Sequence, residues 1–208
     1  MSDQTQVIVE SGQTSGPLTL ERTLQLLDEF CAIYPIADNI DFRICATQEE
    51  LYGPQASRDR VGTIQGGYIP ATRSDQARQA TFRGQCDLAY SSFRDEIDFG
   101  RCLHHEIAGH FGLNTCTADE KRAVLESILL SRQEPGIDEL WARVNHNYAD
   151  QPDLKRAEEL YCTLAEELAT FPAEVFETTQ TLRQLGIAGP RIVQIDELRS
   201  VVAHVATG

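Results

Sequence analysis

The chain has 208 residues, 41% of them hydrophobic and 24% charged, and its formal net charge is −14. This composition is ordinary for a globular protein, and the acidic balance argues against general binding to nucleic acid. No apolar run reaches transmembrane length, and the first six residues lack the features of a signal peptide. We therefore expect a cytoplasmic protein without a membrane partner.

Six cysteines without a C-x-x-C pair are expected to be thiols.

The first half of the chain is expected to alternate helix and strand. Apolar residues at helical spacing predict a helix that begins near Leu20 and is closed by Pro35. Period-two alternation predicts a half-buried strand over 39–46, followed by a turn. The stretch 61–70 is expected to be an edge strand because of its glycines and its closing proline. A further strand is predicted over 86–91.

The second half is expected to be helical. Thr117 to Glu120 has the pattern of a capping box, and helices are predicted after it, after Pro135-Gly136, over 154–171 and over 173–185. The tail 191–205 fits either a helix or a strand followed by a helix. Together these elements predict one α+β domain over 1–208. A helix, a sheet and the active-site helix occupy 18–113, and a mainly helical part occupies 114–208.

The most informative stretch is 103–113, in which His105 is followed by Glu106 and, five residues after the first histidine, by His110. Zinc hydrolases with the H-E-x-x-H motif place two histidines four residues apart on one helix face. A spacing of five on an ideal α-helix separates the two rings by roughly 140°. Either the histidines are unrelated, or the helix widens locally into a π-helix. We expect the widened helix, because Gly109 relaxes the backbone before His110.

This helix is expected to run from Glu96 to Phe111. Asp95 or Asp98 would cap its start, and Gly112 would stop it. Cys102 is read as a small buried residue of the same helix rather than as a metal ligand.

A catalytic zinc ion takes a third protein ligand. The segment Leu164 to Phe171 offers Glu166 and Glu167. On a helical wheel Glu167 lies at the margin of the apolar face and Glu166 lies well away from it. A carboxylate beside a buried face needs a partner, so Glu167 is the predicted ligand and Glu166 its alternative.

Residues 105–113 resemble the H-E-x-x-G-H-x-G-L pattern of zincin-like metallopeptidase domains in polyvalent proteins of phages and conjugative plasmids. Residues 67–72 and 165–169 resemble flanking segments of that family, and the histidine spacing is also similar to that of the H-E-x-x-x-H tubulin tyrosine carboxypeptidases. The resemblance implies a zincin-like fold with a small mixed or antiparallel sheet packed on the active-site helix. It implies that His105, His110 and Glu167 bind Zn²⁺ and that Glu106 is the general base.

The function predicted from these residues is a zinc metallopeptidase that cleaves a peptide or protein substrate with metal-activated water. Tyr148, His146 and Tyr68 are equal candidates for a donor that stabilises the oxyanion. The alternative is a catalytically silent zincin-fold protein whose acidic surface binds a basic partner. The presence of Glu106 favours the enzyme, because a structural zinc site needs no base.

Overall fold

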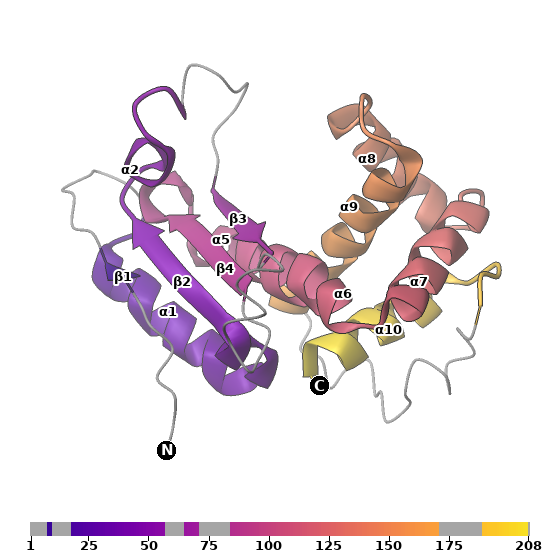
Figure 1. The fold of residues 1–208 in the computed structure, drawn as a ribbon, viewed down its shortest axis with the longest axis horizontal. Coiled ribbons are helices and arrows are strands. Elements are labelled where there is room, and N and C mark those ends of the chain that lie inside the picture. The colour runs from indigo at the N-terminus through magenta and orange to yellow at the C-terminus, as the bar shows by residue number, and fades with distance from the viewer. Residues whose placement is uncertain (1–7, 10–17, 57–64, 71–83, 171–188, 208) are drawn as a thin grey trace. The chain divides into compact units, whose positions relative to one another are not determined.

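The computed structural model describes residues 8–9, 18–56, 65–70, 84–170 and 189–207 (Figure 1). They form a largely helical α+β protein with a small mixed sheet. The predicted α+β class and the small mixed sheet are therefore confirmed. The chain divides into two compact units, Met1–Ile107 and Ala108–Gly208. Among the described residues, none of the helices is both long and apolar enough to span a lipid bilayer.

The sheet of the first unit has the strand order β1-β2-β4-β3. Strands β1 (Ile8–Val9), β2 (Ile40–Cys45) and β4 (Gly84–Ala89) are parallel, and β3 (Gly66–Ile69) is antiparallel to β4. The edge position predicted for the strand before Pro70 is therefore confirmed. The first four residues of that predicted strand, 61–64, lie outside the described residues.

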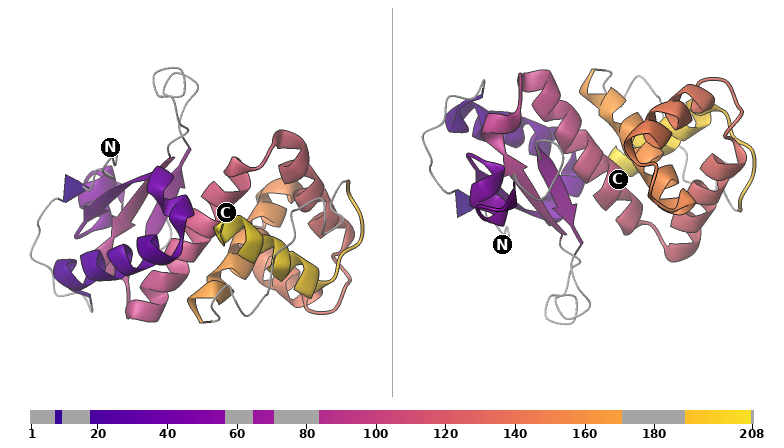
Figure 2. Two further views of the ribbon diagram at one scale, coloured as in Figure 1. Left: turned by 90° about the horizontal axis from the view of Figure 1, so that it is seen from below. Right: turned by 90° about the horizontal axis from the view of Figure 1, so that it is seen from above.

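Two helices lie side by side on one face of this sheet, as both views in Figure 2 show. They are α1 (Leu20–Ile33), whose start is capped by Thr19, and α5 (Glu96–Leu103), whose start is capped by Asp95. The guanidinium of Arg22 on α1 lies 2.7 Å from the carboxylate of Glu96 on α5. The predicted start of each helix is thus confirmed.

Alternation along β2 gives the sheet one apolar face. Ile40, Phe42 and Ile44 are at most 1% exposed and form the core of this unit, because alternate residues of a strand point to the same face. Arg43, on the opposite face, pairs with the fully buried Asp87 of β4. After β2, the expected turn contains a short helix, α2 (Gln48–Tyr52), because Thr47 caps its first turn.

The second unit is a helical assembly around α9 (Asp153–Ala165), which packs against α7 (Ala118–Leu130), α8 (Ile137–Asn147) and α10 (Ile195–Thr207). The predicted capping box at Thr117 and Glu120 is present. The tail 191–205, for which the sequence allowed a helix or a strand followed by a helix, is helical from Ile195. The predicted helix over 173–185 lies outside the described residues. Three 3₁₀ segments complete the description: η1 (Pro35–Asn39), η2 (Tyr90–Ser92) and η4 (Glu166–Ala169).

Two predicted helix ends are wrong. The helix that begins at Glu96 does not stop at Gly112 but continues as α6 (Gly112–Thr115), because Gly112 is not in the left-handed conformation that ends a helix. The helix predicted over 154–171 ends as an α-helix at Ala165 and tightens into η4.

Candidate metal centre

The predicted widening of the helix at the two histidines is confirmed. Residues His104–Phe111 form a π-helical segment, η3, between α5 and α6. A π-helix has roughly 4.4 residues per turn, so five residues complete about one turn. His105 and His110 therefore lie on the same side of one continuous helix. π-Helical turns are rare and concentrate at functional sites.

Three side chains come together at this helix. Ligand atoms of His105, His110 and Cys162 all lie within 4.8 Å of one another. Zn–N and Zn–S bond lengths imply ligand separations of about 3.3–3.6 Å around a tetrahedral ion. Small side-chain rotations therefore suffice to bring the three atoms onto one metal ion. Two imidazoles and one thiol form a possible metal site.

Gly109 allows helix α9 to approach η3 closely. A Cβ built at Gly109 would lie 2.9 Å from the Cα of Cys162 and 2.8 Å from its sulfur. The reason given for this glycine from the sequence, a relaxed backbone, is therefore incomplete. Gly109 is not among the described glycines with positive φ. What the position requires is space, because the backbone of α9 occupies the volume that a side chain would need.

Carboxylates surround His110. Its Nδ1 lies 2.9 Å from Glu158 Oε1, and its Nε2 lies 3.7 Å from Glu159 Oε1. Metal-binding histidines commonly hold one ring nitrogen against a carboxylate, which orients the other nitrogen toward the ion. Glu158 occupies that orienting position, so Nε2 is the nitrogen suited to metal binding. Glu159 is only 4% exposed and is the carboxylate nearest to that nitrogen among the described contacts.

The charge of Glu158 is stabilised by its neighbours. Burial alone would raise the pKa of its carboxyl group, but the hydrogen bond with His110 and the ammonium groups of Lys121 and Lys155 outweigh burial and lower the pKa to about 2. Lys121 Nζ lies 3.2 Å from Glu158, and Lys155 Nζ lies 3.0 Å from Glu159. The carboxylate of Glu158 therefore stays ionised beside His110.

His104 has a different role from its neighbour His105. Its ring packs edge-on against Phe30 and Tyr34, and its Nδ1 donates a hydrogen bond to the Gly100 carbonyl at 2.7 Å. Burial lowers the pKa of His104 to about 4. This imidazole is therefore neutral at physiological pH and belongs to the core of the first unit.

The other predicted site residues have well-defined partners in the structure. Glu106 accepts a hydrogen bond from the Tyr68 backbone N–H at 2.7 Å, on strand β3. Glu167 pairs with Arg199 of α10 through contacts of 2.8 and 3.2 Å. The three-residue metal group contains Cys162 and not Glu167. The general-base role of Glu106 and the ligand role of Glu167 stay predictions.

Sequence reasoning missed Cys162 and the two glutamates before it. No C-x-x-C pair includes Cys162, which instead follows Glu158 and Glu159 by four and three residues on one helix. That spacing places all three on neighbouring positions of α9. A search for helical rows of glutamate and cysteine would have found them. Cys102, expected to be a small buried residue, is only partly buried, and its sulfur lies close to Gly66 of β3.

Comparison with known proteins gives one informative match. The chain is 32% identical over 197 residues to the DNA primase TraC of Escherichia coli; the match covers 92% of this chain and 13% of the primase. The chain thus spans about one eighth of the length of this relative. No protein-family model and no solved structure matches it.

This match contradicts the function predicted from the sequence. A protein similar to nearly the whole chain is named a DNA primase and not a peptidase. The predictions of peptide hydrolysis and of a silent zincin-fold protein with a basic partner are therefore wrong, as are the peptide substrate and the exclusion of nucleic acid. A metal-binding helix is compatible with catalytic and with structural roles, so the motif alone does not determine a reaction. The structure supports a possible metal site at this helix.

Proposed function

We propose that this chain is a metal-binding module of a primase-type protein and that it serves primer synthesis by binding the template strand or the nucleotides. The observation that carries this proposal is the match of 92% of the chain to a DNA primase. Because the chain corresponds to a small part of that relative, a module within a primer-synthesising enzyme fits better than the whole nucleotidyl transferase.

The donor set supports zinc as the metal ion. Imidazole nitrogens and a thiolate are the ligands that Zn²⁺ prefers. Nucleotidyl transfer instead uses Mg²⁺, which binds carboxylates and phosphate oxygens. An ion held by His105, His110 and Cys162 is therefore better suited to fixing α9 against η3 than to transferring nucleotides. In this proposal the ion positions the helix that the second unit is built around.

The resemblance to zincin-like domains enters this proposal only as a likeness of the metal-binding helix. His105 and His110 are the proposed ligands from that helix, and Cys162 supplies the third donor. Glu159 is close enough to His110 Nε2 to approach the same ion. A fourth protein ligand would close the coordination shell, as in structural zinc sites.

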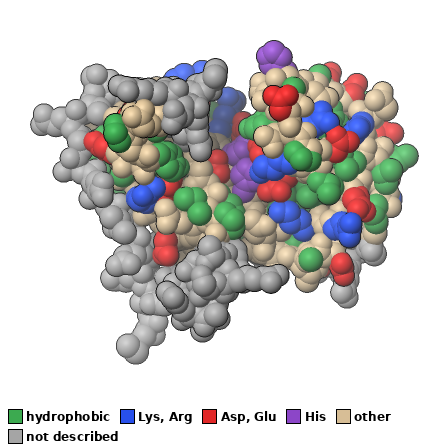
Figure 3. Space-filling model, turned by 45° about the horizontal axis from the view of Figure 1, so that its top comes forward, with side chains coloured by type: hydrophobic (Ala, Val, Ile, Leu, Met, Phe, Trp, Pro, Cys, Tyr) green, Lys and Arg blue, Asp and Glu red, His purple; other side chains and the backbone are tan. Residues whose placement is uncertain are grey.

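The charge distribution limits how nucleic acid is bound. The first 53 residues carry a net charge of −7 and residues 102–208 carry −8, while 54–101 carry +1. On the face shown in Figure 3, acidic and basic side chains of the described residues are interspersed. Because charges of both signs are interspersed, we expect nucleic acid to be bound through local phosphate contacts.

The metal part of the proposal is tested by the metal content of the purified full chain. We expect about one zinc ion per chain in the wild type and a loss of zinc in His110→Ala and Cys162→Ser. His146→Ala, which changes an exposed histidine of α8, is the matched control and should retain zinc. Cobalt substitution adds a second readout, because a cobalt–thiolate absorption band that disappears in Cys162→Ser identifies the sulfur ligand. Equal zinc content in all four proteins would contradict the site.

The nucleic-acid part is tested with a fluorescently labelled single-stranded DNA oligonucleotide and with ribonucleotides. The zinc-loaded chain should bind at least one of them, and the two ligand variants should bind at least tenfold more weakly because α9 is no longer held. His146→Ala should bind like the wild type. Absence of binding to both probes by the zinc-loaded chain would overturn the proposed function.

A further inference from the structure

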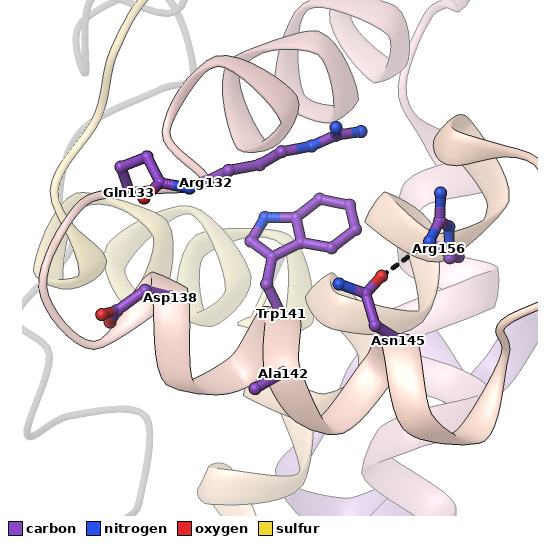
Figure 4. Close-up of a pocket in the computed structure, with 7 residues that line it drawn as sticks. All are labelled: Arg132, Gln133, Asp138, Trp141, Ala142, Asn145 and Arg156. Atoms are coloured by element: carbon purple, nitrogen blue, oxygen red, sulfur yellow. Dashed lines mark hydrogen bonds between the residues drawn. The ribbon is translucent and has the colours of Figure 1, made fainter.

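A second candidate site lies in the helical unit, where Arg132 of the turn after α7 and Arg156 of α9 line one pocket. A pocket of about 270 Å³ is lined mostly by polar side chains from the turn after α7, from α8 and from α9 (Figure 4). The residues that line it are Arg132, Gln133, Asp138, Trp141, Ala142, Asn145 and Arg156. All of them belong to the second unit.

The two guanidinium groups are held in place by the surrounding residues. Arg132 stacks over the ring of Trp141 at 4.8 Å, and Arg156 Nη1 donates to Asn145 Oδ1 at 2.7 Å. Both arginines also pair with Asp153 through their Nη2 atoms. Figure 4 shows that Arg132 and Arg156 come from different elements on either side of the indole. Neither side chain needs to be ordered when a ligand binds, which lowers the cost of binding.

The hydrogen-bonding capacity of these arginines is not filled. A guanidinium offers five N–H donors, and the described hydrogen bonds of Arg132 use only Nη2. The Nε atoms of Arg132 and Arg156 are buried and have no hydrogen-bond partner. Two positive charges share the single carboxylate of Asp153. The two guanidinium groups therefore retain unfilled N–H donors beside the pocket, whose lining also carries the carboxylate of Asp138.

We propose that this pocket binds the phosphate of a nucleotide unit. Arginine guanidinium groups bind phosphate through charge-assisted, forked hydrogen bonds. At about 270 Å³ the pocket is slightly below the ~300–1,000 Å³ typical of small-molecule sites, so it suits one phosphate with part of its sugar. Trp141 is 4% exposed and already covered by Arg132, which leaves no open indole face for a stacked base. Phosphate binding is inferred from the residues that line the pocket, whereas the assignment of that phosphate to a nucleotide rests on the proposed function.

The position of the pocket connects it to the metal centre. Arg156 lies on the same helix, α9, as Glu158 and Cys162. An ion bound by His110 and Cys162 fixes that helix and thereby the spacing of the two guanidinium groups. Loss of the ion should weaken phosphate binding without any change to the pocket residues.

The chain offers a direct reporter, because Trp141 is its only tryptophan and lines the pocket. The full zinc-loaded chain is titrated with inorganic phosphate, a nucleoside monophosphate and a single-stranded oligothymidylate while tryptophan fluorescence is recorded. We expect saturable changes with the nucleotide, the oligonucleotide or both, and weaker binding of inorganic phosphate. The nucleotide and oligonucleotide titrations distinguish a free nucleotide from a strand as the source of the phosphate.

Arg156→Gln and Arg132→Lys should weaken binding at least tenfold, because each removes a charge-assisted or forked contact. Arg122→Gln changes an exposed arginine of α7 outside the pocket lining and is the matched control. Circular dichroism verifies the fold of each variant.

The outcomes separate the two proposals. If the oligonucleotide binds by anisotropy but leaves Trp141 fluorescence and the arginine variants unaffected, the pocket assignment is wrong and the proposed function stands. If inorganic phosphate alone binds, the pocket is a phosphate site and the nucleotide assignment is wrong. If no probe changes the fluorescence and none binds by anisotropy, both proposals are wrong.

Discussion

Replacement of Gly109 by alanine tests whether close contact between η3 and α9 builds the metal centre. The added Cβ would lie 2.8–2.9 Å from three atoms of Cys162, one of which is its backbone Cα. A side-chain tip could rotate away from such a contact, but a helix backbone must move as a whole. We therefore expect Gly109→Ala to displace α9 and to separate the sulfur of Cys162 from His110.

Two opposing contributions set the expected change in stability. Alanine is about 1 kcal/mol more favourable than glycine inside a helix. Overpacking of a buried contact costs about 1–3 kcal/mol, and the backbone contact at Cys162 places this case in the upper part of that range. The free energy of unfolding should therefore fall by about 1–2 kcal/mol. Zinc affinity should also fall, because ligand spacing is disturbed.

Urea denaturation of the metal-free chain measures the change in the free energy of unfolding. Titration with zinc measures the change in zinc affinity. Gly189→Ala is the matched control, since a Cβ there meets no atom within 4 Å. If Gly109→Ala is as stable as the wild type or more stable, and binds zinc equally well, helix propensity alone governs the position. The packing explanation would then be refuted.

Three further predictions follow from single side chains. Glu158→Gln should weaken zinc binding about 10–100-fold without unfolding the chain, because the ring of His110 loses its orienting carboxylate; unchanged affinity in a zinc titration would contradict this. The pKa of His104 lies near 4 in the folded state and near 6.5 in the unfolded chain, so protonation favours unfolding and stability should fall by up to about 3 kcal/mol between pH 6.5 and pH 4. That part of the pH dependence should be absent from denaturation curves of His104→Leu. Thr117→Ala removes the cap of α7 and should cost about 1 kcal/mol in thermal unfolding, whereas no loss would show that the capping box is dispensable.

The elements that the sequence predicted correctly are those whose signals are local. Thr19 and Asp95 cap helices because their side chains accept a backbone N–H three residues later, and such a cap depends on a few neighbouring residues. The edge strand at β3 follows from glycines and Pro70 in the same way. The π-helix at His104–Phe111 was found by combining residue spacing with the requirement that two histidines share one face.

The third metal-site donor was missed because its position depends on the whole second unit. The wheel used for Glu166 and Glu167 assumed a single apolar face and a regular helix. In the structure α9 packs against three other helices, so Leu160, Tyr161 and Cys162 are all fully buried. The last two turns of α9 are buried on nearly every side, so they have no single apolar face whose margin would mark one carboxylate. Glu167 also lies in a 3₁₀ segment, to which the rotation of 100° per residue does not apply.

The mistaken reaction class has a physical reason as well. The spacing of His105 and His110, together with the room left by Gly109, determines only where two imidazoles and a neighbouring thiol meet. Metal-dependent hydrolysis further requires an open coordination position, a positioned base and a substrate groove. Glu159, 3.7 Å from His110 Nε2, can occupy the position that a hydrolytic water needs. The same helix is therefore compatible with a closed structural site that holds α9 in place beside the arginine pocket. A structural zinc ion has four protein ligands, whereas a catalytic zinc ion has three and an open position, so the number of protein ligands distinguishes the two kinds of site.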